Sequence, residues 1–242
     1  MKFGQMTLSK ISPVADYLQL DICGLNKDEA LNRYLKYNTK IPVILHGDWT
    51  KKGVSENDIL KRERIEEYKN IIKRLKEETI VHALTLHPPY RRKIDFDSFV
   101  DIAKEIEEDT KISVLIENRS NKRIWLSKHE EIINFSKIHP MTLDIPQLYI
   151  GCEYKEDKFI SVLEKLNWEN IKEIHLANIM RKENRTFVAR KVEDGIIDLG
   201  NVIKIFNDNS FVTLEILGGV HTFEKQKEIV ENMNKKQTLF TF

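Results

Sequence analysis

Residues 112–119 of the chain read ISVLIENR, a run of apolar and β-branched residues that stops at the carboxylate of Glu117. The composition of this run predicts a buried strand. A carboxylate at the end of such a strand is costly unless a partner, a metal ion or solvent meets it. The end of this strand therefore raises the question of what Glu117 contacts.

Five other apolar runs end in the same way, on a histidine or an acidic residue that could bind a metal. They are IPVILHG (His46), HALTLHPP (His87), PMTLDIPQ (Asp144), IKEIHLAN (His175) and FVTLEILGG (Glu215). A single strand-end histidine is more often hydrogen-bonded to the backbone than bound to a metal. Because six such residues at equivalent positions are hard to explain by chance, we interpret them as one site.

Short apolar runs alternate with longer amphipathic segments along the whole chain, the pattern of repeated βα units around a parallel sheet. Strands are expected at residues 2–5, 17–22, 42–46, 80–87, 112–117, 141–144, 171–176 and 211–216. Helices are expected at residues 27–37, 56–78, 96–108, 128–137, 157–166, 199–206 and 223–233. Ser55, followed three residues later by Asp58, should cap the second helix. This order predicts a single α/β domain over residues 1–242, a (β/α)8 TIM barrel with its active site at the C-terminal ends of the strands.

Three threonines, Thr85, Thr142 and Thr213, each lie two residues before a candidate ligand. Because side chains alternate along a strand, each threonine should face the barrel interior one layer below that ligand. Their hydroxyls are candidates for the hydrogen bonds that orient metal-bound side chains. Threonine is also a common strand residue, so the sequence leaves both interpretations open.

Charge and composition argue against several classes of function. The 242 residues include 39 Lys+Arg and 38 Asp+Glu, a formal charge of +1, which provides no general attraction to nucleic acid or anionic membranes. Cys23 and Cys152 lack zinc-finger or redox spacing, and no stretch has the length of a signal peptide core or a membrane span. We expect a cytoplasmic protein with a small-molecule substrate and no membrane partner.

The six strand-end residues offer three imidazoles and three carboxylates, a donor set suited to Zn²⁺ or Mn²⁺, with Co²⁺ or Mg²⁺ as alternatives. If two ions bind, Glu117 is the natural bridge between them. Candidate substrate-binding residues lie on the loops and strand ends around this set: Trp49, Tyr90, Arg91, Asn118, Gln147 and Arg190. Arginines at such positions could bind a phosphate or a carboxylate, and the aromatic residues could form the wall of a sugar pocket.

Together the motifs LHGDW, LHPPY, LIENR, LDIPQ, IHLAN and LEIL resemble the xylose isomerase-like barrel superfamily over essentially the whole chain. This superfamily includes sugar isomerases and epimerases as well as endonuclease IV-type (AP endonuclease family 2) DNA repair enzymes. The resemblance implies that Glu117, Asp144, His175 and Glu215 form the metal quartet shared by the two branches. In the endonuclease branch, His46 and His87 would hold a second ion together with Glu117.

The chain departs from the endonuclease branch at the ligands of a third ion. Those enzymes have a histidine three residues after the aspartate, where this chain has Gln147, and an Asp-x-His sequence that is missing from the segment TFVARKVEDG. Many epimerases also carry that histidine, so Gln147 distinguishes the chain from them too. Nucleic acid is therefore not an expected partner.

The resemblance implies a metal-dependent isomerase or epimerase acting on a small sugar, sugar phosphate or related polyol. In the implied mechanism, Glu117 or Glu215 removes the proton next to a carbonyl and the other carboxylate returns it, while the metal binds the substrate oxygens. The alternative is a dinuclear phosphoesterase that resembles endonuclease IV without its third metal, and a barrel with a purely regulatory role is a third hypothesis. The number of ions, one or two, and the oligomeric state are left open.

Overall fold

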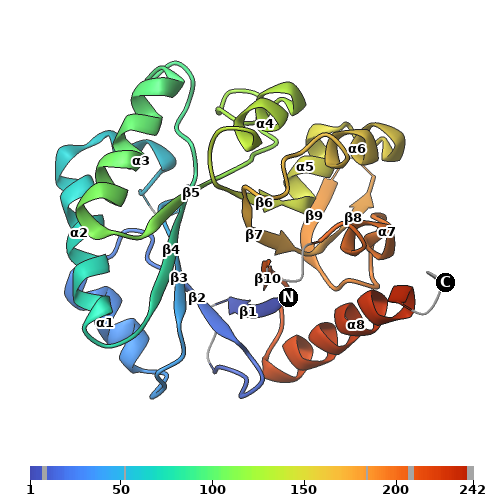
Figure 1. The fold of residues 1–242 in the computed structure, drawn as a ribbon, viewed down its shortest axis with the longest axis horizontal. Helices are drawn as coiled ribbons and strands as arrows, with labels where there is room; N and C mark the ends of the chain where they lie inside the picture. The colour runs from blue at the N-terminus through green and yellow to red at the C-terminus, as the bar shows by residue number, and fades with distance from the viewer. Residues whose placement is uncertain (7–9, 52, 184, 207–209, 239–242) are drawn as a thin grey trace.

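The computed structural model describes residues 1–6, 10–51, 53–183, 185–206 and 210–238, and it contains a closed barrel of parallel strands (Figure 1). The strands follow one another around the barrel in the order β1-β10-β7-β6-β5-β4-β3-β2, and β1 pairs with β2 to close it. Their bounds are β1 Lys2–Met6, β2 Tyr17–Asp21, β3 Val43–His46, β4 Val81–Leu86, β5 Ser113–Glu117, β6 Met141–Asp144, β7 Ile171–Leu176 and β10 Phe211–Leu214. The predicted TIM barrel is confirmed.

Helices surround this barrel and pack their apolar faces against the strands (Figure 1). They are α1 Lys27–Leu35, α2 Arg62–Lys76, α3 Phe96–Thr110, α4 His129–Ser136, α5 Ile145–Gly151, α6 Glu156–Leu163, α7 Leu199–Ile203 and α8 Val220–Thr238. In α2, for example, Ile65, Ile72 and Leu75 are buried at helical spacing. Within the described residues, no helix is long and apolar enough to cross a membrane.

The segment expected to form one helix over residues 56–78 is divided in the structure. A 3₁₀ helix, η1 (Glu56–Leu60), precedes α2, and Lys61 between them has an extended backbone with φ −86° and ψ 128°. Ser55 and Asp58 form the predicted capping box, but they form it on η1. The short helix is fixed by contacts outside its own sequence, because Ile59 is buried and Glu56 accepts a hydrogen bond from Thr50 at 2.7 Å.

Two elements near the mouth of the barrel are not among the predicted ones. An antiparallel hairpin of β8 (Asn178–Lys182) and β9 (Arg185–Arg190) lies between β7 and α7, outside the barrel sheet. The short helix α5 follows β6 directly, without an intervening loop. Both elements contribute residues to the cavity described below, so the mouth is more enclosed than the strand and helix pattern alone predicts.

The inward-facing side chains form layers, as expected from the two-residue alternation along each strand. The bottom layer is apolar and contains Tyr17, Ile44, Ala83 and Leu115, packed against Phe211. The middle layer is polar and contains Gln19, Thr85, Thr142, Glu173 and Thr213, all buried. The top layer lies at the C-terminal ends of the strands, where the six candidate metal ligands are found.

Candidate metal centre

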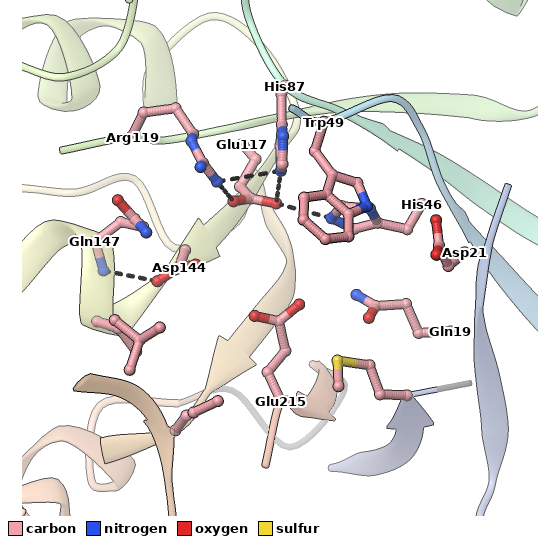
Figure 2. A pocket seen from close by; sticks show the side chains of 15 residues that line it. Gln19, Asp21, His46, Trp49, His87, Glu117, Arg119, Asp144, Gln147 and Glu215 are labelled. Carbon is pink, nitrogen blue, oxygen red and sulfur yellow. Dashed lines mark hydrogen bonds and ion pairs between the residues drawn. The ribbon is translucent and has the colours of Figure 1, made fainter. Parts of the chain in front are cut away.

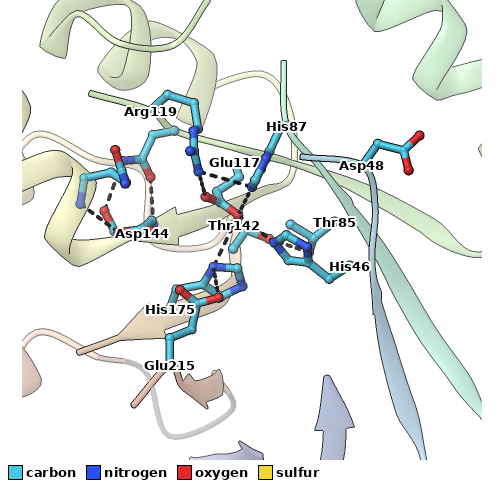
Figure 3. A network of polar contacts seen from close by, with 12 residues as sticks. His46, Asp48, Thr85, His87, Glu117, Arg119, Thr142, Asp144, His175 and Glu215 are labelled. Atoms are coloured by element: carbon cyan, nitrogen blue, oxygen red, sulfur yellow. Dashed lines mark hydrogen bonds and ion pairs between the residues drawn. The ribbon is translucent and has the colours of Figure 1, made fainter. Parts of the chain in front are cut away.

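The six strand-end residues converge at the mouth of the barrel, each from a different strand (Figure 3). Their ligand atoms form three groups, each within 4.8 Å: Glu117–Asp144–His175, His46–His87–Glu117 and His46–His175–Glu215. All are buried except Glu215, whose side chain is 24% exposed. The mouth of the barrel therefore brings together three imidazoles and three carboxylates.

Glu117 lies at the centre of these groups. Its Oε2 atom lies 3.4 Å from His46 Nε2, 3.1 Å from His87 Nε2 and 3.3 Å from His175 Nδ1. Its Oε1 atom accepts a hydrogen bond of 2.8 Å from Arg119 Nη1. Burial opposes ionisation, but the surrounding histidines outweigh it and hold the pKa of Glu117 well below its usual range. The residue is therefore a carboxylate.

His175 has its two ring nitrogens in different surroundings. Nε2 points down the barrel, 2.7 Å from the amide nitrogen of Gln19 and 3.3 Å from Oε2 of Glu173. Nδ1 points toward the mouth, 3.3 Å from carboxylate oxygens of both Glu117 and Glu215. This Nδ1 atom is buried and makes no hydrogen bond to any residue in the described part of the chain. A histidine held at one nitrogen by a carboxylate presents the other nitrogen to a metal ion in many metalloproteins.

The three threonines of the middle layer hold Glu173 rather than the candidate ligands themselves. Thr85, Thr142 and Thr213 donate hydrogen bonds of 2.6, 3.1 and 2.7 Å to its carboxylate. Glu173 is completely buried, and burial would raise its pKa, but His175 and these hydroxyls lower it. The threonines thus act on His175 through a charged intermediate residue.

Asp144 is positioned by the chain segments on both sides of it. It is the N-cap of α5, and its Oδ1 atom accepts a hydrogen bond of 2.7 Å from the backbone nitrogen of Gln147. Its own backbone is bound at N and O by the side-chain amide of Asn118, at 2.7 and 3.0 Å. Burial, together with the negative charges of Glu117 and Glu215, raises the pKa of Asp144 well above its ordinary value.

These contacts test whether the quartet could hold a cation. Burial alone would lower the pKa of His175. The carboxylates of Glu215, Glu173 and Glu117 outweigh this effect and raise the pKa well above its ordinary value. The raised pKa values of Asp144 and His175 show that the carboxylates attract positive charge, which a proton or a metal ion can provide. Together with the Nδ1 atom of His175, which makes no hydrogen bond among the described residues, Glu117, Asp144 and Glu215 offer one nitrogen and several oxygens, a set that fits Zn²⁺ or Mn²⁺.

A cavity of about 360 Å³ opens directly above the ligands (Figure 2). Its walls include Gln19, Trp49, Arg119 and Gln147, and Val188 and Ala189 of the hairpin. His46, His87, Glu117, Asp144 and Glu215 also face it. Ligand pockets of small molecules have volumes of roughly 300–1,000 Å³, so the space suits a small polar substrate.

Of the residues expected to bind substrate, the structure places Trp49 and Gln147 on the cavity wall. The side chain of Gln147 is fixed by Ser120, whose backbone nitrogen and hydroxyl both donate to Gln147 Oε1, at 3.1 and 2.5 Å. A role for these two residues in substrate binding stays a prediction.

Arg91 and Asn118 are held by contacts within the protein, and the substrate role expected for each stays a prediction. Arg91 forms a two-pronged ion pair with Glu131, at 2.8 and 2.6 Å, and its guanidinium lies 4.5 Å from the ring centre of Trp125. Asn118 is completely buried and uses both ends of its amide on the backbone of Asp144. Arg91 therefore stabilises its loop, and Asn118 positions a candidate metal ligand.

Tyr90 and Arg190 are also absent from the lining of this cavity among the described residues. Tyr90 forms a β-bridge with Ile124, and its backbone nitrogen donates to Asn57 at 3.0 Å. Arg190 lies at the end of β9, opposite Asn178 and next to the cavity-lining residue Ala189. Loop and hairpin pairing, which sequence proximity to a ligand does not reveal, directs these residues elsewhere.

Two charged residues of the site are missing from the sequence-based predictions, although the sequence contains a signal for both. Glu173 precedes His175 by two residues and therefore faces the same side of β7, as Thr213 does relative to Glu215. Arg119 follows Glu117 by two residues, and its guanidinium returns to the Glu117 carboxylate. The alternation that was applied to the threonines predicts the inward orientation of Glu173 as well.

Solved structures of other proteins share this fold. No protein-family model matches the chain, and no curated protein matches it by sequence. The solved structures similar to it include the IolI protein with a bound zinc atom, at 15% identity over 100% of both chains and a TM-score of 0.66. A xylose isomerase domain protein from Planctomyces limnophilus is 13% identical over 97% of this chain and 96% of its own, with a TM-score of 0.62.

A third similar structure is a xylose isomerase domain containing protein from Salmonella typhimurium LT2. It is 14% identical over 91% of this chain and 88% of its own, with a TM-score of 0.57. At such low identities the similarity establishes the fold and does not establish the activity. The chain therefore shares the TIM-barrel fold of these proteins.

Proposed function

We propose that this protein is a metal-dependent isomerase or epimerase that moves a proton next to the carbonyl of a small sugar, sugar phosphate or related polyol. The observation that carries the proposal is the orientation of His175. Its Nδ1 atom is buried, makes no hydrogen bond to a described residue and lies 3.3 Å from both Glu117 and Glu215 beneath a small cavity. This geometry is expected of a histidine that binds an ion together with carboxylates.

The chemistry follows from the two glutamates at the cavity. A divalent ion held by Glu117, Asp144, His175 and Glu215 would act as a Lewis acid toward a substrate carbonyl. Both glutamates line the cavity, so one can accept the proton from the adjacent carbon while the other donates a proton back. Glu215 is the better candidate for the first step, because it is the more exposed of the two and carries no ion pair with an arginine among the described contacts.

The proposal is tested by proton exchange, which does not require the product to be known. Zinc-loaded and manganese-loaded protein is incubated in D₂O with a panel of free and phosphorylated aldoses and ketoses, and NMR detects deuterium at the carbon next to the carbonyl. We expect exchange with at least one member of the panel and its loss in Glu215→Gln. Glu130→Gln, a change at an exposed position of α4, is the matched control and should keep full exchange. Absence of exchange throughout, from protein with a stoichiometric ion, contradicts the proposal.

A dinuclear phosphoesterase is the second candidate, because His46, His87 and Glu117 form a further group of possible ligands. In that reaction two ions would hold the phosphate and the attacking oxygen. Hydrolysis of bis(p-nitrophenyl) phosphate by the same metal-loaded samples separates the two candidates. Turnover of this ester, lost in Glu117→Gln and His87→Ala, would favour the phosphoesterase.

A further inference from the structure

Arg119 lies beside Glu117 and His87 on the wall of the cavity (Figure 2). Its Nη1 atom donates a hydrogen bond of 2.8 Å to Glu117 Oε1 and lies 3.2 Å from His87 Nε2. The side chain is only 20% exposed. A permanent positive charge thus contacts two of the three members of the His46–His87–Glu117 group.

Arg119 occupies two atoms that a second metal ion would need, Oε1 of Glu117 and Nε2 of His87. A carboxylate that bridges two ions offers one oxygen to each, but Oε1 of Glu117 is already bound to Arg119. The histidines all approach the same remaining oxygen, Oε2. His87 would have to direct its Nε2 lone pair at an ion about 2.0–2.1 Å away, and the guanidinium nitrogen lies close to that same atom.

The other contacts of Arg119 do not neutralise its charge. Its backbone nitrogen is bound to Leu126 O at 2.9 Å, which fixes the start of the loop after β5. Among the described residues its only ion pair is the one with Glu117, and its buried Nε atom has no hydrogen-bond partner. Arg91, on a neighbouring loop, differs in this respect, because it is neutralised by Glu131 and neither residue lines the cavity. Arg119 therefore has its charge directed at the site.

We infer that the guanidinium of Arg119 takes the place of a second metal ion, so that the cavity holds one ion at the quartet and the His46–His87–Glu117 group stays free of metal. The inference rests on the proposed function to the extent that the quartet must bind its ion. It predicts that this chain uses an arginine where a dinuclear barrel would use a second metal ion. The arginine would neutralise the charge of Glu117 and donate hydrogen bonds to substrate oxygens. Removal of the arginine should open a second metal site.

Metal stoichiometry tests this inference. Chelator-treated protein is dialysed against excess Zn²⁺ or Mn²⁺ and desalted, metal content is measured by plasma mass spectrometry, and Mn²⁺ EPR reports whether two ions lie close enough to couple. The parent should bind about one ion per chain and Arg119→Met about two, the second held by the nitrogen and oxygen ligands left behind. Arg119→Gln serves as a second neutral variant if Arg119→Met does not fold by circular dichroism.

Two further variants locate the second ion. Arg119→Met combined with His87→Ala should return to about one ion per chain, because a ligand of the new site is gone. Arg91→Met removes an arginine of the neighbouring loop and should not change the parent stoichiometry. Two ions in the parent, one ion in the folded Arg119 variants, or two ions in the double variant would each overturn the inference. If the parent binds two ions, the inference about Arg119 is wrong but the quartet can still be the metal site of the proposed function. If the parent binds none, the proposed function is overturned as well.

Discussion

The two sides of Glu117 are built from the same kinds of residue and differ in charge. On one side, Asp144, Glu215 and His175 Nδ1 gather without an ion pair to any lysine or arginine of the described residues, and the pKa values of Asp144 and His175 are raised. On the other side, Arg119 contacts both Glu117 and His87. Burial lowers the pKa of His87 to about 3, with Glu117 opposing the shift and Arg119 adding to it.

This difference shows that a ligand-capable residue at a strand end does not by itself define a metal site. Histidine and carboxylate donors are available on both sides, but one side has an excess of negative charge and the other already contains a cation. Metal affinity depends on the charges near the ligands as well as on the ligands. The quartet side should therefore bind the ion, and the histidine side should shape the cavity.

The largest effect is expected from Glu117→Gln, because Glu117 belongs to both sides. The substitution keeps the shape of the side chain and removes the charge that an ion requires. We expect loss of the bound ion and a fall in proton exchange of roughly 10²–10⁴-fold, measured by metal analysis and NMR. Circular dichroism should show an intact barrel. A variant that keeps both its ion and its activity would remove the basis of the whole site.

Glu173→Gln should have the next largest effect, although Glu173 lies below the ligands and does not face the cavity. The carboxylate contacts His175 Nε2 and is held by three threonines. Loss of such a partner typically weakens metal binding by about 10–100-fold, which titration calorimetry with Zn²⁺ or Mn²⁺ measures. Glu169→Gln, an exposed position before β7, is the matched control. Equal affinity in the two variants would show that His175 does not depend on Glu173.

The mouth of the barrel could be predicted from the sequence because it depends on local patterns. Strand alternation and the βα repeat are enough to bring Glu117, Asp144 and His175 to one end of parallel strands. Glu173 was missed because a glutamate within a strand is usually taken to be exposed. It lies two residues before His175, and this spacing places both side chains on the same face of the strand. Its stability in the core depends on three threonines from three other strands.

Features that the sequence pattern does not reveal depend on partners that are distant in sequence. Arg91 was assigned to the substrate because it follows a ligand-bearing strand, but Glu131, forty residues further along, neutralises it. The expected helix over residues 56–78 is broken at Lys61, because contacts with the neighbouring loop bury η1. Periodicity reports which face of an element is apolar, and it does not report which loop will pair with it.

His46→Ala and His87→Ala should have smaller effects, since they change only the side of the site that contains Arg119. The quartet should keep its ion, and kcat/KM for exchange should fall by roughly tenfold through altered cavity shape. The measurements are the metal content and the proton-exchange rate of the two variants. Loss of an ion together with most of the activity would mean that the histidine side binds metal. Unchanged behaviour of both variants would place neither histidine in the site.

The smallest effect is expected on abasic DNA, where the resemblance to endonuclease IV-type enzymes would suggest a large one. Those enzymes use three ions, whereas this chain has Gln147 at one ligand position of the third ion, and Arg119 contacts the group that would hold the second. With a formal charge of +1, few phosphates could be neutralised at once, so duplex binding should be weak and sensitive to salt. We therefore expect no efficient cleavage of a labelled abasic duplex by zinc-loaded or manganese-loaded protein at moderate salt. Repeated turnover of the duplex, lost in Glu117→Gln so that a contaminating nuclease is excluded, would reverse the order of the two functions and show that the histidine side of Glu117 binds metal despite Arg119.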